Sequence, residues 1–186
     1  MLIDELINNY ELGVLSPINK ECSNFFIESQ GTPLVKSLPR IYSDIQKVKV
    51  RKRKNQNSFS NAFNSAFVND MRDLRERSIF VHNTHIVNET HEEFYIFPID
   101  GFKFLYNKTI EDSVEDYKKT FESIFNSLES SADTVFSDLL RLTYISEDLQ
   151  AGMNLGSELI LYGIPYYYAI RVSSVDDYDE LLTVLK

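Results

Sequence analysis

The chain has 186 residues, the length of one domain, and its 43% hydrophobic and 13% aromatic residues can fill a packed core. The net charge of −9 excludes a general nucleic-acid coat protein, and a total of 6 glycines argues against a Gly-rich phosphate loop and an all-β fold with many tight turns.

The charge is unevenly distributed along the chain. Residues 36–77 contain 11 basic and 4 acidic residues, whereas the remainder contains 8 basic and 24 acidic residues. This asymmetry predicts two different electrostatic surfaces, of which only the basic one can face phosphate.

The single cysteine, Cys22, cannot form an intramolecular disulfide, which favours a reducing compartment. No stretch approaches the roughly 18 consecutive apolar residues of a membrane span. Acidic Asp4 and Glu5 stand where a signal peptide is basic. We therefore expect a protein without membrane contact, in the cytoplasm or within a viral particle.

Residues 1–40 are predicted to form an N-terminal arm, and residues 41–186 a single α+β domain. Apolar side chains at helical spacing predict a short amphipathic helix over residues 2–12, which Gly13 ends. Three prolines after it favour an extended segment. A helix this short must dock on its own domain or on a partner. The expected docking residues are Leu2, Ile3, Leu6 and Ile7.

Residues 41–54 show a partial strand pattern with one basic face. One interpretation is a protected edge strand that runs into a loop. The other is contact with a polyanion or with an acidic partner surface. The candidate contact residues are Lys47, Lys49, Arg51, Lys52, Arg53 and Lys54.

Amphipathic periodicity predicts helices over residues 58–77, 109–130 and 133–146. We expect them to pack against a small, aromatic-rich antiparallel sheet. This sheet would contain a meander near residues 79–106 and a second hairpin over residues 158–172.

The C-terminal residues 173–186 are predicted to form a capped helix. This helix either packs on its own domain or docks on a partner. The tyrosine run at residues 166–168 is interpreted as part of the sheet or core, with a recognition surface as the alternative.

Two groups of residues were considered for metal or catalytic chemistry. His82, His85 and His91 lie close together in the sequence, but a regular strand would point the first two to opposite faces, so no metal site is predicted. Asp100, Asp116 and Lys118 resemble nuclease spacing only loosely, because the last two fall on a helix.

The chain lacks a nucleophile elbow, a P-loop and a dinucleotide fingerprint. We therefore expect no enzyme activity and no cofactor. The favoured function is an interaction or assembly protein, a subunit or accessory factor of a larger complex such as a viral particle. It would dock through its N-terminal arm and acidic C-terminal half on a protein partner or on another copy of itself. The alternatives are a nucleic-acid-binding accessory factor that uses residues 47–54 and, less favoured, a metal-dependent nuclease or hydrolase.

Overall fold

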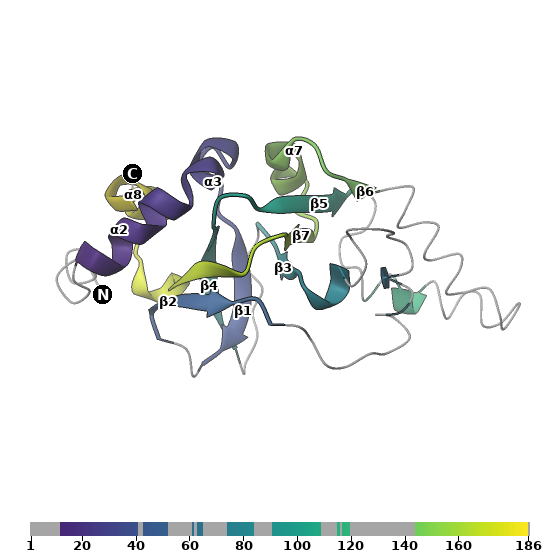
Figure 1. The fold of residues 1–186 in the computed structure, drawn as a ribbon, viewed down its shortest axis with the longest axis horizontal. Coiled ribbons are helices and arrows are strands. Elements are labelled where there is room, and N and C mark those ends of the chain that lie inside the picture. The colour runs from purple at the N-terminus through teal and green to yellow at the C-terminus, as the bar shows by residue number, and fades with distance from the viewer. Residues whose placement is uncertain are drawn as a thin grey trace, which may run out of the picture.

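The computed structural model describes residues 12–40, 43–51, 61, 63–64, 74–83, 91–108, 115, 117–119 and 144–185. Within these residues the strands form two four-stranded antiparallel sheets, and short helices pack around them (Figure 1). The predicted α+β class is therefore confirmed. None of the helices in this part of the chain combines the length and the apolar composition needed to cross a lipid bilayer.

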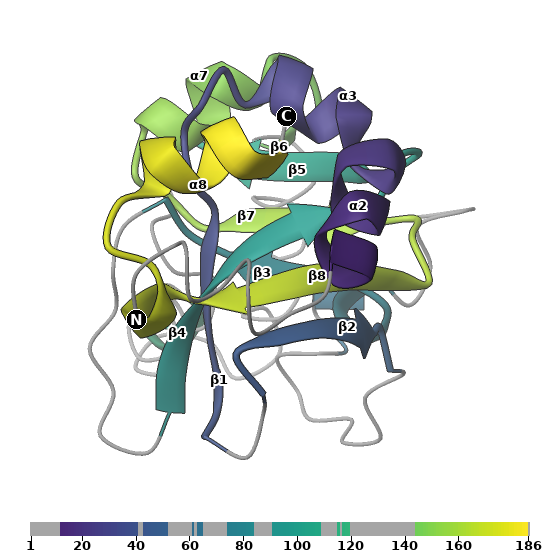
Figure 2. The same ribbon diagram turned by 90° about the vertical axis from the view of Figure 1, so that its left-hand side faces the viewer.

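Sheet A contains, in spatial order, β1 (Val35–Pro39), β4 (His91–Pro98), β8 (Tyr166–Arg171) and β2 (Ile45–Lys49). Five consecutive residues of the central strand β4, from Phe94 to Pro98, are buried. A continuous buried run of this kind is expected where both faces of a strand are covered. β2 lies at the edge of the sheet, which agrees with the edge-strand interpretation for these residues (Figure 2).

Sheet B contains, in spatial order, β3 (Ile79–Val81), β7 (Leu159–Tyr162), β5 (Lys103–Asn107) and β6 (Tyr144–Ile145). The backbones of Val35 and His82 join the two sheets. The Val35 N–H donates to the His82 carbonyl at 2.6 Å, and the His82 N–H donates to the Val35 carbonyl at 2.9 Å. This bridge places β1 beside the end of β3.

The predicted strand pairings were wrong, although strands do form in the predicted regions. β3 and β5 belong to sheet B whereas β4 belongs to sheet A, so residues 79–106 are not a meander. Residues 158–172 are not a hairpin, because β7 and β8 belong to different sheets. Between them Gly163 has a φ of +84° and Ile164 is buried, so this short connection crosses between the sheets instead of reversing the chain. Sequence neighbours pair only as a tendency, which long-range burial overrides here.

The described part of the predicted extended arm is folded. It forms α2 (Leu12–Glu21), α3 (Ser23–Glu28) and β1, and β1 pairs with β4 across the boundary predicted at residue 40. Pro17 lies inside α2 and removes one helical hydrogen bond. The side chains of Ile18 and Phe25 are 0% exposed, and their burial outweighs that loss. Gly13 likewise lies inside α2 and does not end a helix.

Only fragments of the three central predicted helices fall among the described residues. Residues 61, 63, 64, 115 and 117–119 are helical, and a 3-10 turn, η2, covers Leu74–Glu76. Tyr144 and Ile145 form β6, so the prediction of helix up to residue 146 was wrong at its end. The buried ring of Phe63 lies 5.9 Å from the ring of Phe80 and 6.1 Å from that of Tyr144, centroid to centroid. Phe63 is therefore part of the core.

The C-terminal region contains α7 (Leu149–Asn154), a 3-10 turn η3 (Val172–Ser174) and α8 (Tyr178–Leu185). α8 confirms the predicted terminal helix. The Asp177 carboxylate accepts the Asp179 N–H at 2.7 Å and so caps the first turn. Leu181, Leu182 and Leu185 are buried, and α8 lies beside α2 (Figures 1 and 2). Of the two interpretations of this helix, packing on its own domain is the one observed.

Candidate functional site

A small hollow of about 110 Å³ lies where β1, the end of β2 and the start of β3 meet. Its lining is rich in basic residues and contains one serine and one tyrosine. The lining residues are Lys36, Lys49, Val50, Arg51, Ser78, Ile79 and Tyr167. We call this feature the basic hollow.

The three basic residues of the hollow come from two segments that the fold brings together. Lys36 lies on β1, and its ammonium group donates a hydrogen bond to the Phe80 carbonyl on β3 at 2.7 Å. Lys49 and Arg51 are exposed at and just beyond the end of β2. The Val50 N–H donates to the Pro165 carbonyl at 2.9 Å, which extends the pairing with β8 and holds this end of the strand in place.

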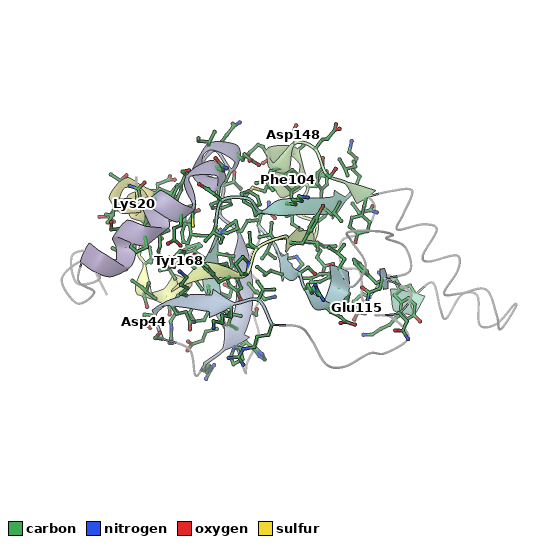
Figure 3. All side chains as sticks on the ribbon, in the orientation of Figure 1. Lys20, Asp44, Phe104, Glu115, Asp148 and Tyr168 are labelled. Carbon is green, nitrogen blue, oxygen red and sulfur yellow. The ribbon has the colours of Figure 1, made fainter. Side chains whose placement is uncertain are left out.

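Lys47 occupies a different site, on the side of sheet A next to α2. Its Nζ lies 3.6 Å from the Glu21 Oε2 atom and 3.6 Å from the centre of the Tyr166 ring. The same Glu21 oxygen accepts hydrogen bonds from the hydroxyls of Tyr166 at 2.9 Å and Tyr168 at 2.7 Å. Tyr168, on β8, is labelled in Figure 3. Lys47 on the edge strand of sheet A therefore contacts α2 through Glu21, and it does not line the basic hollow.

Glu21, Lys47, Tyr166 and Tyr168 form a group that we call the Glu21 cluster. The contacts within this cluster shift the pKa values of several of its members. The hydrogen bond from Tyr168 is the main cause that lowers the pKa of the Glu21 carboxyl below its ordinary value. Burial, together with the hydrogen bond to Glu21, raises the pKa of Tyr168 to about 12. Contact with Tyr166 is the main cause that raises the pKa of the Lys47 ammonium. At neutral pH the cluster thus holds the Glu21 carboxylate, the Lys47 ammonium and the neutral phenol of Tyr168.

Glu21→Gln is expected to lower the free energy of unfolding by about 1 kcal/mol at neutral pH, a value discounted because the Glu21 side chain is 38% exposed. The folded-state pKa of Glu21 is lowered, so its stabilisation is present above the unfolded pKa and is lost as pH falls through the folded pKa. Urea denaturation should show the difference between wild type and variant at neutral pH and its disappearance in acid. The exposed Glu28, changed to Gln, is the matched control. A difference that grows as pH falls would contradict this assignment.

The other residues predicted for binding divide into two groups. Lys49 and Arg51 line the basic hollow. The remaining residues lie outside the described part of the chain: Leu2, Ile3, Leu6, Ile7, Lys52, Arg53 and Lys54. Sequence reasoning did not single out Lys36 or Ser78, whereas Tyr167 belongs to the tyrosine run for which a recognition surface was the alternative interpretation. The basic balance that begins at Lys36 was a signal for that residue, and the sequence around Ser78 carried none.

The two described histidines, His82 and His91, lie at different places in the fold. β3 ends at Val81, and the backbone of His82 pairs with Val35. His91 begins β4 opposite Pro39, and His85 lies outside the described residues. In the described part of the chain, no group of three or more His, Cys, Asp or Glu residues is placed to hold a metal ion.

Asp100 and Cys22 both lie near the start of α3, where their surroundings fit a structural role. The Asp100 carboxylate accepts the Ser23 hydroxyl at 2.7 Å and the Asn24 N–H at 2.8 Å, so it caps the helix. Lys118, the proposed catalytic lysine, donates to Glu115, and Asp116 lies outside the described residues.

Burial raises the pKa of the Cys22 thiol to about 12. A buried thiol that stays protonated at neutral pH is a poor nucleophile.

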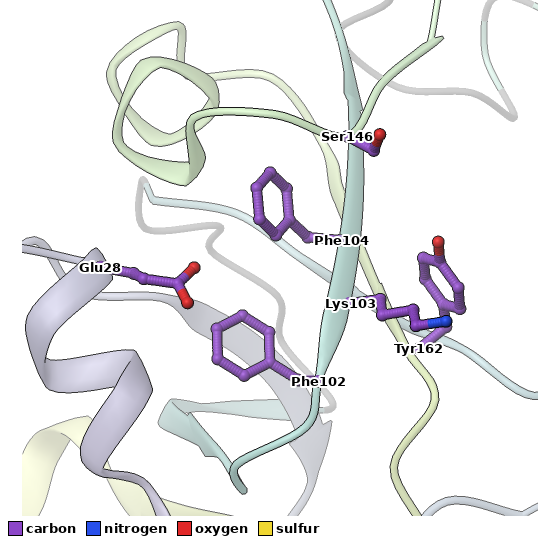
Figure 4. A pocket seen from close by; sticks show the side chains of 6 residues that line it. All are labelled: Glu28, Phe102, Lys103, Phe104, Ser146 and Tyr162. Carbon is purple, nitrogen blue, oxygen red and sulfur yellow. The ribbon is translucent and has the colours of Figure 1, made fainter.

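A second, larger cleft of about 300 Å³ lies along β5 (Figure 4). Phe102 and Phe104 lie on the side that faces Glu28 of α3, while Lys103 and Tyr162 lie on the other side of the strand. The cleft contains one acidic and one basic residue on opposite sides. It has no concentration of charge comparable with the basic hollow.

Comparisons of the chain with protein-family models, with curated proteins and with solved structures found no match. In the basic hollow, side chains of a single charge from separate segments meet at a concavity.

Proposed function

We propose that this protein is an interaction or accessory protein that binds the phosphate backbone of a nucleic acid through the basic hollow. The observation that carries the proposal is the convergence of Lys36, Lys49 and Arg51 on one concavity of a chain whose net charge is −9. A local cluster of cations attracts a polyanion even when the protein as a whole is acidic.

The surroundings of the hollow support this proposal. Lys49 and Arg51 are exposed, and Arg77, which follows the η2 turn close in sequence to Ser78, is exposed as well. Arginine and lysine side chains bind phosphate oxygens through charge-assisted hydrogen bonds. Contact with phosphates alone positions a nucleic acid and reads little sequence, so we expect weak sequence preference.

A second candidate is contact with an acidic protein surface, including that of another copy of this chain. The observation that favours it is the exposed acidic group at the start of α8, which contains Asp176, Asp177, Asp179 and Glu180. A contact between the hollow of one copy and α8 of another forms a dimer where it is reciprocal, and rings or open chains where it is heterologous. Light scattering at low and high salt tests this candidate. A strict monomer at low salt would contradict it.

The nucleic-acid proposal is tested with a double variant, Lys49→Ala with Arg51→Ala. We expect it to bind a fluorescent oligonucleotide at least about ten-fold more weakly than wild type at low salt. Loss of two phosphate contacts should also reduce the slope of log affinity against log salt by about 1.8 for duplex DNA. Fluorescence anisotropy across a salt series measures both quantities.

The matched control is Lys20→Ala with Lys103→Ala. Both lysines are exposed, and neither lines the basic hollow. This control removes the same net charge, so it should lower affinity much less than the hollow variant does. Equal losses in the two variants would show that binding is non-local, and absence of wild-type binding at low salt would refute the proposal.

A further inference from the structure

The lining of the basic hollow includes a buried hydroxyl without a hydrogen-bond partner among the described residues. Ser78, the residue before β3, is 6% exposed and lines the hollow. Its hydroxyl oxygen has no hydrogen-bond partner among the described residues. A buried hydroxyl without a partner destabilises the folded state, so such a group in a binding concavity points to a ligand atom that completes it.

One cation and one wall of the hollow around Ser78 are held in place by the fold itself. Lys36 is held at the start of β3 by its hydrogen bond to the Phe80 carbonyl at 2.7 Å. Tyr167 is buried and pairs with Val48 on β2, so this wall of the hollow is fixed by the sheet. Lys49 and Arg51 complete the lining from the end of β2. Preorganised donors of this kind lower the ordering cost of binding.

The size of the hollow limits what can occupy it. Its volume of about 110 Å³ is well below the roughly 300–1,000 Å³ of pockets that enclose a drug-sized ligand. A nucleobase with its sugar does not fit inside it, but a single tetrahedral oxyanion does. The lining matches such an anion, because it supplies positive charge from three side chains and a neutral hydroxyl donor.

We propose that the basic hollow is a binding site for the terminal phosphate of a phosphate monoester, and we call this site the phosphate seat. This inference rests on the proposed function and adds the chemical class of the group that enters the hollow. The Ser78 hydroxyl would donate to one phosphate oxygen, and Arg51 can contact two oxygens at once. Lys36 and Lys49 balance the charge of a group that carries close to two negative charges at neutral pH. An internal phosphodiester has only one charge and two flanking sugars, so it fits the seat less well.

The experiment compares two oligonucleotides of the same sequence, one with a 5′-phosphate and one with a 5′-hydroxyl. We expect wild type to bind the phosphorylated form at least ten-fold more tightly. Ser78→Ala should lower this preference several-fold without changing affinity for the hydroxyl form, and Lys36→Met should abolish it. Ser146→Ala and Lys103→Met, in the cleft along β5, are the matched controls and should leave the preference unchanged. Far-UV circular dichroism of each variant monitors folding.

A second arm identifies the source of the phosphate. Inorganic phosphate and a nucleoside 5′-monophosphate are titrated separately into wild type and Ser78→Ala, with binding followed by calorimetry. Tighter binding of the mononucleotide than of the oligonucleotide would identify a free nucleotide as the natural source, and the reverse would identify a nucleic-acid end.

The outcomes separate this inference from the proposed function. Equal affinity for the two oligonucleotides would overturn the phosphate seat and leave backbone binding in place. Serine-dependent binding of phosphate or mononucleotide without oligonucleotide binding would support the seat and overturn the polyanion proposal. If Ser78→Ala raises the melting temperature and leaves every affinity unchanged, the hydroxyl is only an unfavourable buried group and the seat is refuted.

Discussion

Phe97→Ala is expected to lower the free energy of unfolding by about 3–5 kcal/mol, which is a large share of the total stability of a domain. Phe97 lies on the central strand β4 and is 0% exposed. Its ring contacts Phe25 of α3 edge-on, with centroids 6.0 Å apart, and stacks on Tyr178 of α8 at 6.4 Å. Removing it leaves a cavity between sheet A and two helices that come from opposite ends of the chain.

Urea denaturation followed by circular dichroism measures this loss. Ile27→Ala is the control, because Ile27 lies on the same helix as Phe25 and is 73% exposed. We expect the control to change stability by no more than about 0.5 kcal/mol. If Phe97→Ala cost as little as the control, the segment before β1 would not be part of the cooperative core. That result would restore the sequence-based prediction of a separable arm.

The prediction of an extended segment after residue 12 was wrong, for a reason that particular residues make clear. Pro17, Pro33 and Pro39 were interpreted as signs of an extended segment. In the structure Pro17 is inside α2, Pro33 lies just before β1, and Pro39 ends β1. Prolines report local backbone preferences, whereas Ile18 and Phe25 are fixed by contacts with distant residues. The positions of the prolines in the sequence could not reveal those contacts.

Strand positions were easier to predict than strand partners. The β-branched and aromatic runs at residues 79–81, 94–97, 103–106 and 166–170 did mark strands, because side-chain composition acts locally. Pairing instead depends on which apolar faces meet. Tyr95 pairs with Val35 on one side and Ile170 on the other, at separations of 60 and 75 residues. A single sequence gives no signal for contacts at those distances.

The candidate site shows the same division. The basic run that contains Lys49 and Arg51 was visible as a local charge pattern. The pattern could not show that Lys47, two residues earlier, contacts Glu21 and Tyr166 and does not line the hollow. Nor could it show that the Val35–His82 bridge brings Lys36 beside residues 78–80. The charge pattern of the sequence indicated a basic surface, whereas the strand topology determines which of its basic residues line the same hollow.

Gly152→Val is expected to destabilise the protein by about 3 kcal/mol, and Gly152→Ala by a smaller amount. Gly152 lies in the middle of α7, where alanine would ordinarily stabilise a helix by about 1 kcal/mol. A Cβ atom at this position, however, would lie 2.6 Å from the Cδ1 atom of Tyr106. The Tyr106 ring is 2% exposed and part of the core, so it has little room to retreat. Steric overlap should therefore exceed the gain in helix propensity.

A double-mutant cycle identifies the cause. Gly152→Ala should cost less in a Tyr106→Leu background than in wild type, because the smaller side chain removes the overlapping ring atoms. Asn154→Ala, at an exposed position of the same helix, should be nearly neutral and controls for general effects on α7. Thermal and urea denaturation of the four proteins of the cycle measure the coupling. A Gly152→Ala variant more stable than wild type would mean that α7 can move away from β5, and the close packing of these two elements would then not limit the sequence at this position.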